Sequence, residues 1–271
     1  MRVPDPRAWA LVLALSLAGC GARSELAACE RGQVRTCESF CGQGIQRCVQ
    51  GEWTECSTRP PEGEVSLPAT VRDFRSDHPD FEADVIGDDP GIVAPLLGPD
   101  GKPVYAGTPS TPTTTGQANF DQWFRDVPSV NQRTEILITL VGDGGDPPVY
   151  RFDSPNFFPI DGQLFGDEDN PHNFHFTLEM VVDFKYSGGE RFIFRGDDDV
   201  FAYLNGHLAI DLGGVHGAES ATVDLDSVAE PFGLIPGEVF PLALFFAERH
   251  TSGSSFYIET TIADFDVCPD N

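Results

Sequence analysis

The sequence predicts an all-β protein built as a β-sandwich or jelly roll. Short segments that alternate apolar and polar residues follow one another closely, glycine-rich turns separate them, and no long stretch has helical periodicity. The predicted strands are residues 136–141, 174–186, 191–195, 200–204, 207–212, 221–225, 240–247 and 256–262. Short strands at this spacing favour two packed antiparallel layers around one apolar core.

The strongest turn signal is Asn205-Gly206, which joins two of these segments. A two-residue hairpin turn needs positive φ at both central positions, and Asn followed by Gly adopts it readily. Three consecutive aspartates, Asp197, Asp198 and Asp199, precede the first strand of this hairpin. Adjacent carboxylates repel one another, so they need solvent, hydrogen-bond donors or a cation, and oxygen ligands suit calcium. We therefore predict a calcium site here, with turn-capping carboxylates as the structural alternative.

One short helix is expected in the loop-rich first half of the chain. Asn119 is a candidate N-cap, and Phe120, Trp123 and Phe124 then share one helical face. The sequence therefore predicts a short helix with one aromatic face.

The first residues have the pattern of an export signal. Arg2 and Arg7 precede a short apolar stretch, and Cys20 follows Leu-Ala-Gly at residues 17–19. This pattern resembles the bacterial lipoprotein signature, which implies cleavage after residue 19, lipidation of Cys20 and anchoring in the outer membrane, at the cell surface or the periplasmic face. An ordinary signal peptide with an unrelated cysteine remains the alternative.

The formal charge of −26 excludes one class of partner. Lys102 and Lys185 are the only lysines, and nucleic acids require clustered cations. The acidity is compatible with binding of divalent ions.

Six cysteines follow Cys20, an even number that predicts disulfides in an exported chain. They are Cys29, Cys37, Cys41, Cys48, Cys56 and Cys268. Five fall in a small N-terminal module at residues 20–58, so complete pairing would use Cys268 outside it. The connectivity stays open. Residues 59–65, which are rich in proline and glycine, read as a linker, and residues 66–271 as one β-sandwich domain.

A series of short blocks in this domain resembles the fibro-slime domain, in family order. The blocks lie at residues 70–74, 78–82, 122–127, 157–161, 172–177, 196–200, 211–217 and 246–251. Fibro-slime domains are similar to the protective-antigen-like β-sandwich found in surface and secreted proteins. The resemblance therefore implies a sandwich with an extracellular role.

The resemblance also implies a site. Related yeast adhesins bind glycans through calcium held by two adjacent aspartates joined by a cis peptide, and Asp197 and Asp198 match that pair. The second ligand loop lacks the expected asparagine, and Glu248 is the candidate replacement. Arg249 beside it is expected to form an exposed ion pair at the rim of the site.

The candidate ligand contacts are His216, His250 and Ser254, and the alternative role of the two histidines is to anchor their loops by hydrogen bonds. Together these observations predict a non-catalytic surface protein that binds a polysaccharide or extracellular matrix in an adhesin-like manner. Two alternatives stay open: a structural or protein-interaction module without sugar binding, and a carbohydrate-active enzyme. The oligomeric state cannot be predicted.

Overall fold

The computed structural model describes Cys29 and residues 33–39, 42–49, 51–53, 63–82, 84 and 86–266. Within these ranges no helix is long and apolar enough to span a membrane. The predicted export signal and Cys20 lie outside the described residues.

Eleven strands form one large sheet in the order β11-β10-β14-β8-β4-β6-β7-β15-β9-β13, with β16 paired to β8. Neighbouring strands in this sheet are antiparallel. The bounds are β4 Glu64–Asp73, β6 Gln132–Gly142, β7 Tyr150–Ser154, β8 Phe176–Lys185, β9 Arg191–Gly196, β10 Asp199–Leu204, β11 His207–Leu212, β13 Glu219–Asp224, β14 Val239–Glu248, β15 Phe256–Thr260 and β16 Phe265–Asp266. Two short strands, β5 (Gly87–Asp88) and β12 (Gly214–Val215), pair separately.

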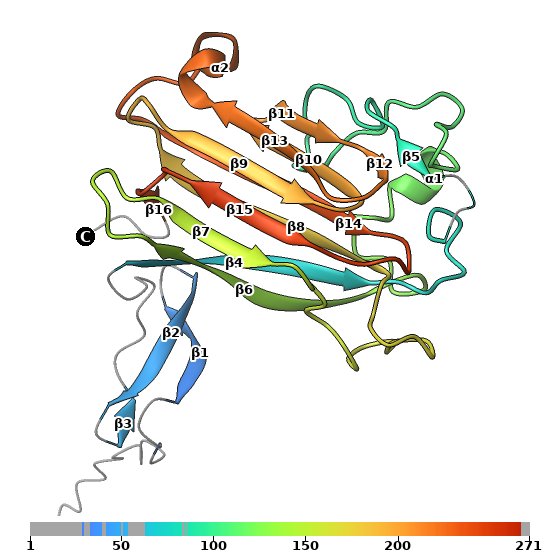
Figure 1. Ribbon diagram of the computed structural model, residues 1–271, viewed down its shortest axis with the longest axis horizontal. Coiled ribbons are helices and arrows are strands. Elements are labelled where there is room, and N and C mark those ends of the chain that lie inside the picture. The colour runs from blue at the N-terminus through green and yellow to red at the C-terminus, as the bar shows by residue number, and fades with distance from the viewer. Residues whose placement is uncertain are drawn as a thin grey trace, which may run out of the picture.

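The large sheet folds over on itself into two layers. In Figure 1, β7, β15, β9 and β13 pass in front of β8 and β14, and the two ends of the sheet, β11 and β13, lie close together. The inward side chains of both layers form one apolar core, which includes Met180, Phe194, Phe246 and Phe256. The all-β sandwich prediction is confirmed.

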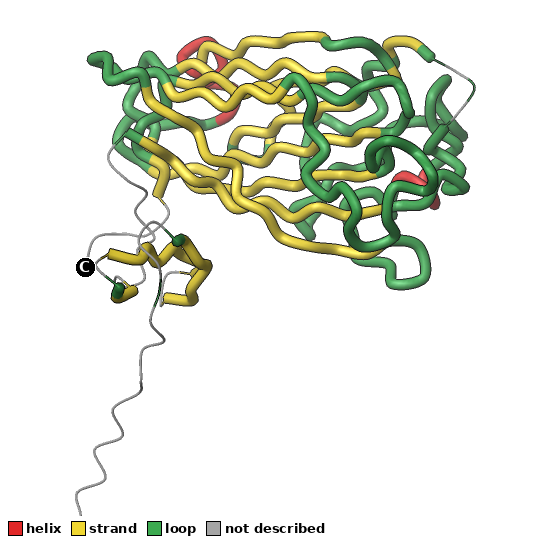
Figure 2. The backbone as a smooth tube through the Cα atoms, turned by 60° about the horizontal axis from the view of Figure 1, so that its bottom comes forward, coloured by secondary structure: helices red, strands yellow, loops and turns green. Residues whose placement is uncertain are grey.

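The strands β10 and β14 are buried on both faces. Leu244 and Phe246 of β14 point into the main core, whereas Phe245 between them packs into a second core, as the two-residue period of a strand requires. The second core lies under the long excursion at residues 74–131, which supplies Trp123 and Phe124. Figure 2 shows these loops covering one end of the sheet.

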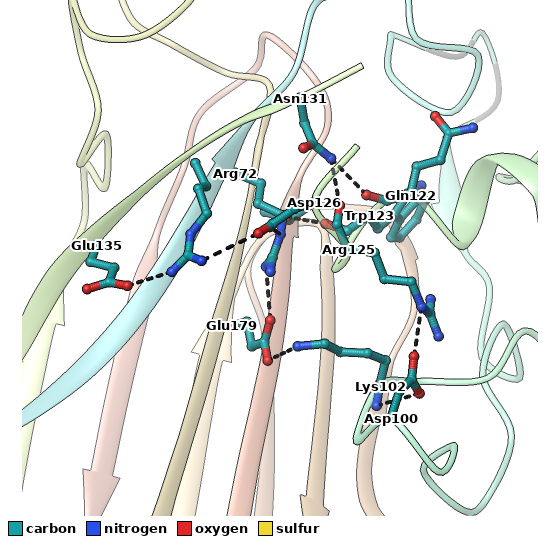
Figure 3. Close-up of polar contacts among 12 residues, drawn as sticks. Arg72, Asp100, Lys102, Gln122, Trp123, Arg125, Asp126, Asn131, Glu135 and Glu179 are labelled. Carbon is teal, nitrogen blue, oxygen red and sulfur yellow. Dashed lines mark hydrogen bonds and ion pairs between the residues drawn. The ribbon is translucent and has the colours of Figure 1, made fainter. Parts of the chain in front are cut away.

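Ion pairs fasten this excursion to the sheet (Figure 3). Arg72 of β4 is 5% exposed and bonds Asp126 through Nε at 2.8 Å and Glu179 of β8 through Nη1 at 2.9 Å. Lys102 reaches the other oxygen of Glu179, and Arg125 bonds Asp100 at 2.9 Å. The contacts tie two turns of the excursion to two strands.

The N-terminal module contains β1 (Val34–Ser39), β2 (Gly42–Val49) and β3 (Glu52–Trp53), which form a separate antiparallel sheet. A disulfide joins Cys29 to Cys48 with a Cα–Cα distance of 5.8 Å. This confirms the prediction of disulfide bonding and gives one pair of a connectivity that the sequence left open. The backbone of Cys37 lies in β1, and Cys41, Cys56 and Cys268 lie outside the described residues, so their pairing stays a prediction.

All eight predicted strands are present, with ends shifted by a few residues. The strand β4 was not predicted, because Pro68 interrupts its pattern. Pro68 is tolerated because β8 pairs only with the stretch from Thr70 to Asp73, so β4 has a single neighbour at the proline. The strand begins at Glu64, inside the predicted linker.

The predicted N-cap is wrong. Helix α1 (Gln117–Phe120) begins after Gly116 without a side-chain cap, and Asn119 lies inside it. Its amide instead donates to Thr115 Oγ1 at 2.7 Å. A second helix, α2 (Leu225–Phe232), follows β13 and was not predicted. The helix ends at Phe120, and the three aromatics are buried together, since Phe120, Trp123 and Phe124 are each at most 1% exposed.

Candidate functional site

The predicted site residues meet at one end of the sandwich because of strand register. Asp199 at the start of β10 pairs with Ala247 of β14, which places Asp198 beside Glu248. Gly196 at the end of β9 pairs with Phe256 of β15, which places Asp197 beside the loop that ends at Ser255. Residues some 50 positions apart thus share one corner.

Asp197 and Asp198 form the link between the two layers, since β9 and β10 pair with different strands. Asp197 accepts a hydrogen bond from Ser255 N, and Asp198 Oδ2 accepts one from Arg249 N at 2.8 Å. Asp198 has a φ of 54° and is 3% exposed. The cis peptide that the resemblance implied is absent here: the described cis bonds are Thr108–Pro109 and Asp146–Pro147. The left-handed residue makes the sharp turn instead.

Asp199 and Arg249 form a completely buried ion pair. Arg249 Nε donates to Asp199 Oδ2 at 2.5 Å, and both side chains are 0% exposed. The other guanidinium nitrogens donate to Thr113 and to the backbone oxygen of Asp80, and the ring of Trp123 lies 4.6 Å below. Burial lowers the pKa of a guanidinium, but the Asp199 carboxylate more than offsets this and the pKa of Arg249 is raised.

The expected exposed pair between Arg249 and Glu248 is therefore wrong. Neighbouring residues in a strand point to opposite faces, so Arg249 and Glu248 cannot share a direction. Asp199 is also committed elsewhere: Oδ1 accepts Gly214 N at 2.8 Å and Oδ2 accepts Arg249. A Cβ at Gly214 would collide with the backbone of β5, so the chain approaches Asp199 there only because it has no side chain.

Several buried polar atoms around this corner have no hydrogen-bond partner. They are Glu248 Oε2, Ser254 Oγ, Ser255 Oγ and His216 Nε2. Burial raises the pKa of Glu248 well above its ordinary value, and the Asp198 carboxylate raises it further. Burial likewise raises the pKa of Asp198 to about 7, despite the charge of Arg249. The corner thus buries two carboxyl groups, Asp198 and Glu248, close together, and Arg249 behind them is already paired with Asp199.

Oxygen atoms dominate this unsatisfied set, which is the chemistry of a hard cation. Among the described residues, however, no group of three or more His, Cys, Asp or Glu side chains is already arranged around one point as metal ligands. A cation here would draw on hydroxyl, backbone or solvent oxygens as well as on Asp197, Asp198 and Glu248.

The predicted ligand contacts divide into two sets. Ser254 and His216 belong to the corner, and the backbone oxygen of His216 accepts Asp198 N at 3.5 Å. His250 lies apart, with Nε2 3.6 Å from Glu82 Oε2. Glu82 Oε1 also accepts a hydrogen bond from Thr251 N at 3.0 Å and lies 2.9 Å from His175 Nε2. The sequence reasoning missed Glu82, because nothing in its spacing connects it to a loop 169 residues away.

Comparison with known proteins places this geometry in a family. Residues 120–265, from the last residue of α1 to the start of β16, match the PA14 domain. The chain belongs to the PA14 domain family. The match covers the aspartate corner, the hairpin and the loop after β14, whereas β4 and most of the excursion precede it.

Similar curated proteins include two from Dictyostelium discoideum. Protein psiR is 40% identical over 203 residues, which are 69% of this chain and 20% of psiR. Protein psiD is 39% identical over 226 residues, which are 75% of this chain and 43% of psiD. The PA14 chain therefore spans less than half the length of either relative.

Solved structures are similar to this chain only at low identity and low TM-score. The PA14 sugar-binding domain from an RTX adhesin is 13% identical, with a TM-score of 0.27, over 47% of this chain and 72% of that one. The epithelial adhesin 9 A domain from Candida glabrata, solved with Galβ1-4GlcNAc, is 12% identical, with a TM-score of 0.30, over 77% and 89%. At these values the likeness assigns no ligand to this chain.

Proposed function

We propose that this PA14 domain is a non-catalytic, extracellular glycan-binding module of adhesin type, and that its aspartate corner holds calcium. One observation carries the proposal: Glu248, 1% exposed, has a carboxylate oxygen without a partner in a corner that also buries Asp198. A buried carboxylate is costly unless it is protonated or its charge is compensated, and bound calcium is the compensation proposed here. Bound calcium would supply positive charge and open coordination positions for sugar hydroxyls.

The residues have distinct roles in this proposal. Asp197, Asp198 and Glu248 are the proposed ligands, with Ser254 Oγ close to them. Asp199 forms the buried ion pair with Arg249, whose backbone N–H binds Asp198, and so fixes the position of Asp198. His216 and Ser254 would contact the sugar, and His250, which faces Glu82, would contribute from the edge of the same loop.

Calcium titration calorimetry tests the metal site. Wild type should show a heat of calcium binding, and the double variant Asp197→Asn/Asp198→Asn should show none. Ligand at one hundred times its Kd stabilises a protein by about 2.7 kcal/mol, which corresponds to a rise in Tm of roughly 5–10 °C for a domain of this size. Asp153→Asn, on the exposed face of β7, is the matched control and should keep both effects. Equal heats for wild type and the double variant would refute calcium binding here.

A second variant separates the metal from general loss of structure. Glu248→Gln removes the buried charge but keeps the shape, so in EDTA its Tm should equal or exceed that of wild type. The increase in Tm on adding calcium should disappear. A lower Tm in EDTA together with an intact calcium response would contradict the role of Glu248.

The cellular setting completes the proposal. We propose a fibro-slime type of PA14 domain, exported and lipid-anchored at Cys20 in the outer membrane, with many anchored copies providing avidity toward a polysaccharide. Mass spectrometry of the mature protein should find a lipidated N-terminal Cys20, and an unmodified residue would refute the anchor. A glycan array in calcium tests sugar binding. Hydrolysis of a bound polysaccharide would contradict the non-catalytic role and favour a carbohydrate-active enzyme.

A further inference from the structure

A second feature lies at the same end of the sandwich as the aspartate corner. The rings of Phe158 and His172 are stacked with centroids 4.0 Å apart and an interplanar angle of 2°. The edge of this stack rests on Phe174, which is only 5% exposed. The His172 side chain is 42% exposed, although one of its ring faces is covered by Phe158.

A carboxylate fixes the orientation of the exposed ring. Asp161 Oδ2 lies 2.7 Å from His172 Nδ1, and Asp161 Oδ1 accepts Asn173 N at 2.9 Å. The imidazole is therefore held on three sides, by Phe158, Phe174 and Asp161. A ring fixed in this way loses little conformational freedom when a ligand packs on it.

Strand register shows how the loop that carries Phe158 leaves the sheet relative to the aspartate corner. Phe256 of β15 pairs with Ser154 at the end of β7 and with Gly196 at the end of β9. Ser154 and Gly196 are therefore two strand spacings apart, about 10 Å. The loop that carries Phe158 leaves from Ser154, and Asp197 follows Gly196. Ser254 lies between them, since its backbone oxygen accepts Phe157 N at 2.9 Å.

We propose that the Phe158–His172 stack is a second sugar subsite, so that the domain recognises oligosaccharides of at least two residues. The inference rests on the proposed glycan-binding function and extends it to the size of the ligand. The C–H groups on one face of a pyranose form an apolar surface that packs on an aromatic ring. In this proposal one sugar occupies the aspartate corner and another sugar of the same chain packs on the stack, whose loop leaves the sheet two strands away from Gly196.

The test is a glycan array of mono- to hexasaccharides in calcium, read with wild type, His172→Ala and His172→Phe. Wild type should prefer glycans of two or more residues. His172→Ala should bind these about fivefold to tenfold more weakly and monosaccharides equally well. His172→Phe should restore the preference, because it keeps a flat ring.

The chain offers a matched control at the other end of the hairpin. His207 stacks on Phe232 with centroids 4.9 Å apart and an angle of 14°, beside the Asn205-Gly206 turn. His207→Ala removes a similar stack and should leave the array unchanged. Long-range proton–nitrogen NMR gives a direct readout, since the imidazole signals of His172 should shift with a disaccharide that the array identifies.

The outcomes separate the subsite from the function it depends on. Identical array profiles for wild type and His172→Ala would overturn the subsite and leave glycan binding intact. Equal binding of monosaccharides and longer glycans by wild type would do the same. Absence of all glycan binding by wild type in calcium would overturn both proposals.

Discussion

The three consecutive aspartates show how neighbouring identical residues acquire different roles. Asp197 faces Ser255 at the surface, Asp198 makes the turn, and Asp199 points inward to Arg249. The sequence predicted an acidic corner, and the corner exists. Its buried counter-charge could not be predicted, because Arg249 lies 50 residues away and a charged stretch next to a strand end reads as exposed.

Replacing Arg249 by methionine tests the buried pair. Arg249→Met leaves Asp199 buried without its partner, and we expect the free energy of unfolding to fall by about 3–5 kcal/mol in urea titrations. Arg133→Met is the control, because Arg133 is 46% exposed in its pairs with Asp126 and Glu135 and such pairs contribute about 0–1 kcal/mol. Similar losses for the two variants would contradict the importance of burial.

At the scale of elements, regular strands were predictable and the excursion was not. The continuous apolar run at residues 240–247 predicted β14 almost completely, because each face of that strand meets a different core. The excursion at residues 74–131 packs Trp123 onto Arg249 and Asp80 without any regular period. Side chains placed by irregular backbone leave no periodic signal, so core residues of the excursion such as Phe81 and Tyr105 were not predicted.

The hairpin turn offers a clean test of local conformation. Asn205 and Gly206 have φ values of 50° and 77°, as predicted for this pair. A Cβ at Gly206 meets nothing within 4 Å, so Gly206→Ala costs only the strain of the left-handed conformation, about 1–2 kcal/mol. Gly217→Ala is the control, since that position is equally open but has no positive φ. Equal unfolding free energies for the two variants would contradict this account.

At the scale of the whole molecule, a charge of −26 makes stability depend on pH. Mutual repulsion of carboxylates weakens as they are protonated. Two buried groups, His78 and Asp73, change the free energy of unfolding with pH in opposite directions. Burial lowers the pKa of His78, so its contribution is present above about pH 6.5 and is lost as the pH falls. Burial raises the pKa of Asp73 to about 6, so its contribution is present at low pH and is lost as the pH rises through 6.

Asp73 therefore gives the protein a stability term of unusual sign for a carboxylate. A shift from 3.8 to about 6 makes the folded state more stable at pH 5 than at pH 7.5 by about 1–1.5 kcal/mol from this group alone. Urea titrations in EDTA at the two pH values should show that Asp73→Asn removes this part of the difference. Asp153→Asn, on the exposed face of β7, should leave the difference unchanged. Asp73 is the group to test because it is 0% exposed and accepts hydrogen bonds from Asn173 and from Phe165 N. If Asp73→Asn kept the full pH dependence of stability, that dependence would arise from the general acidity of the surface.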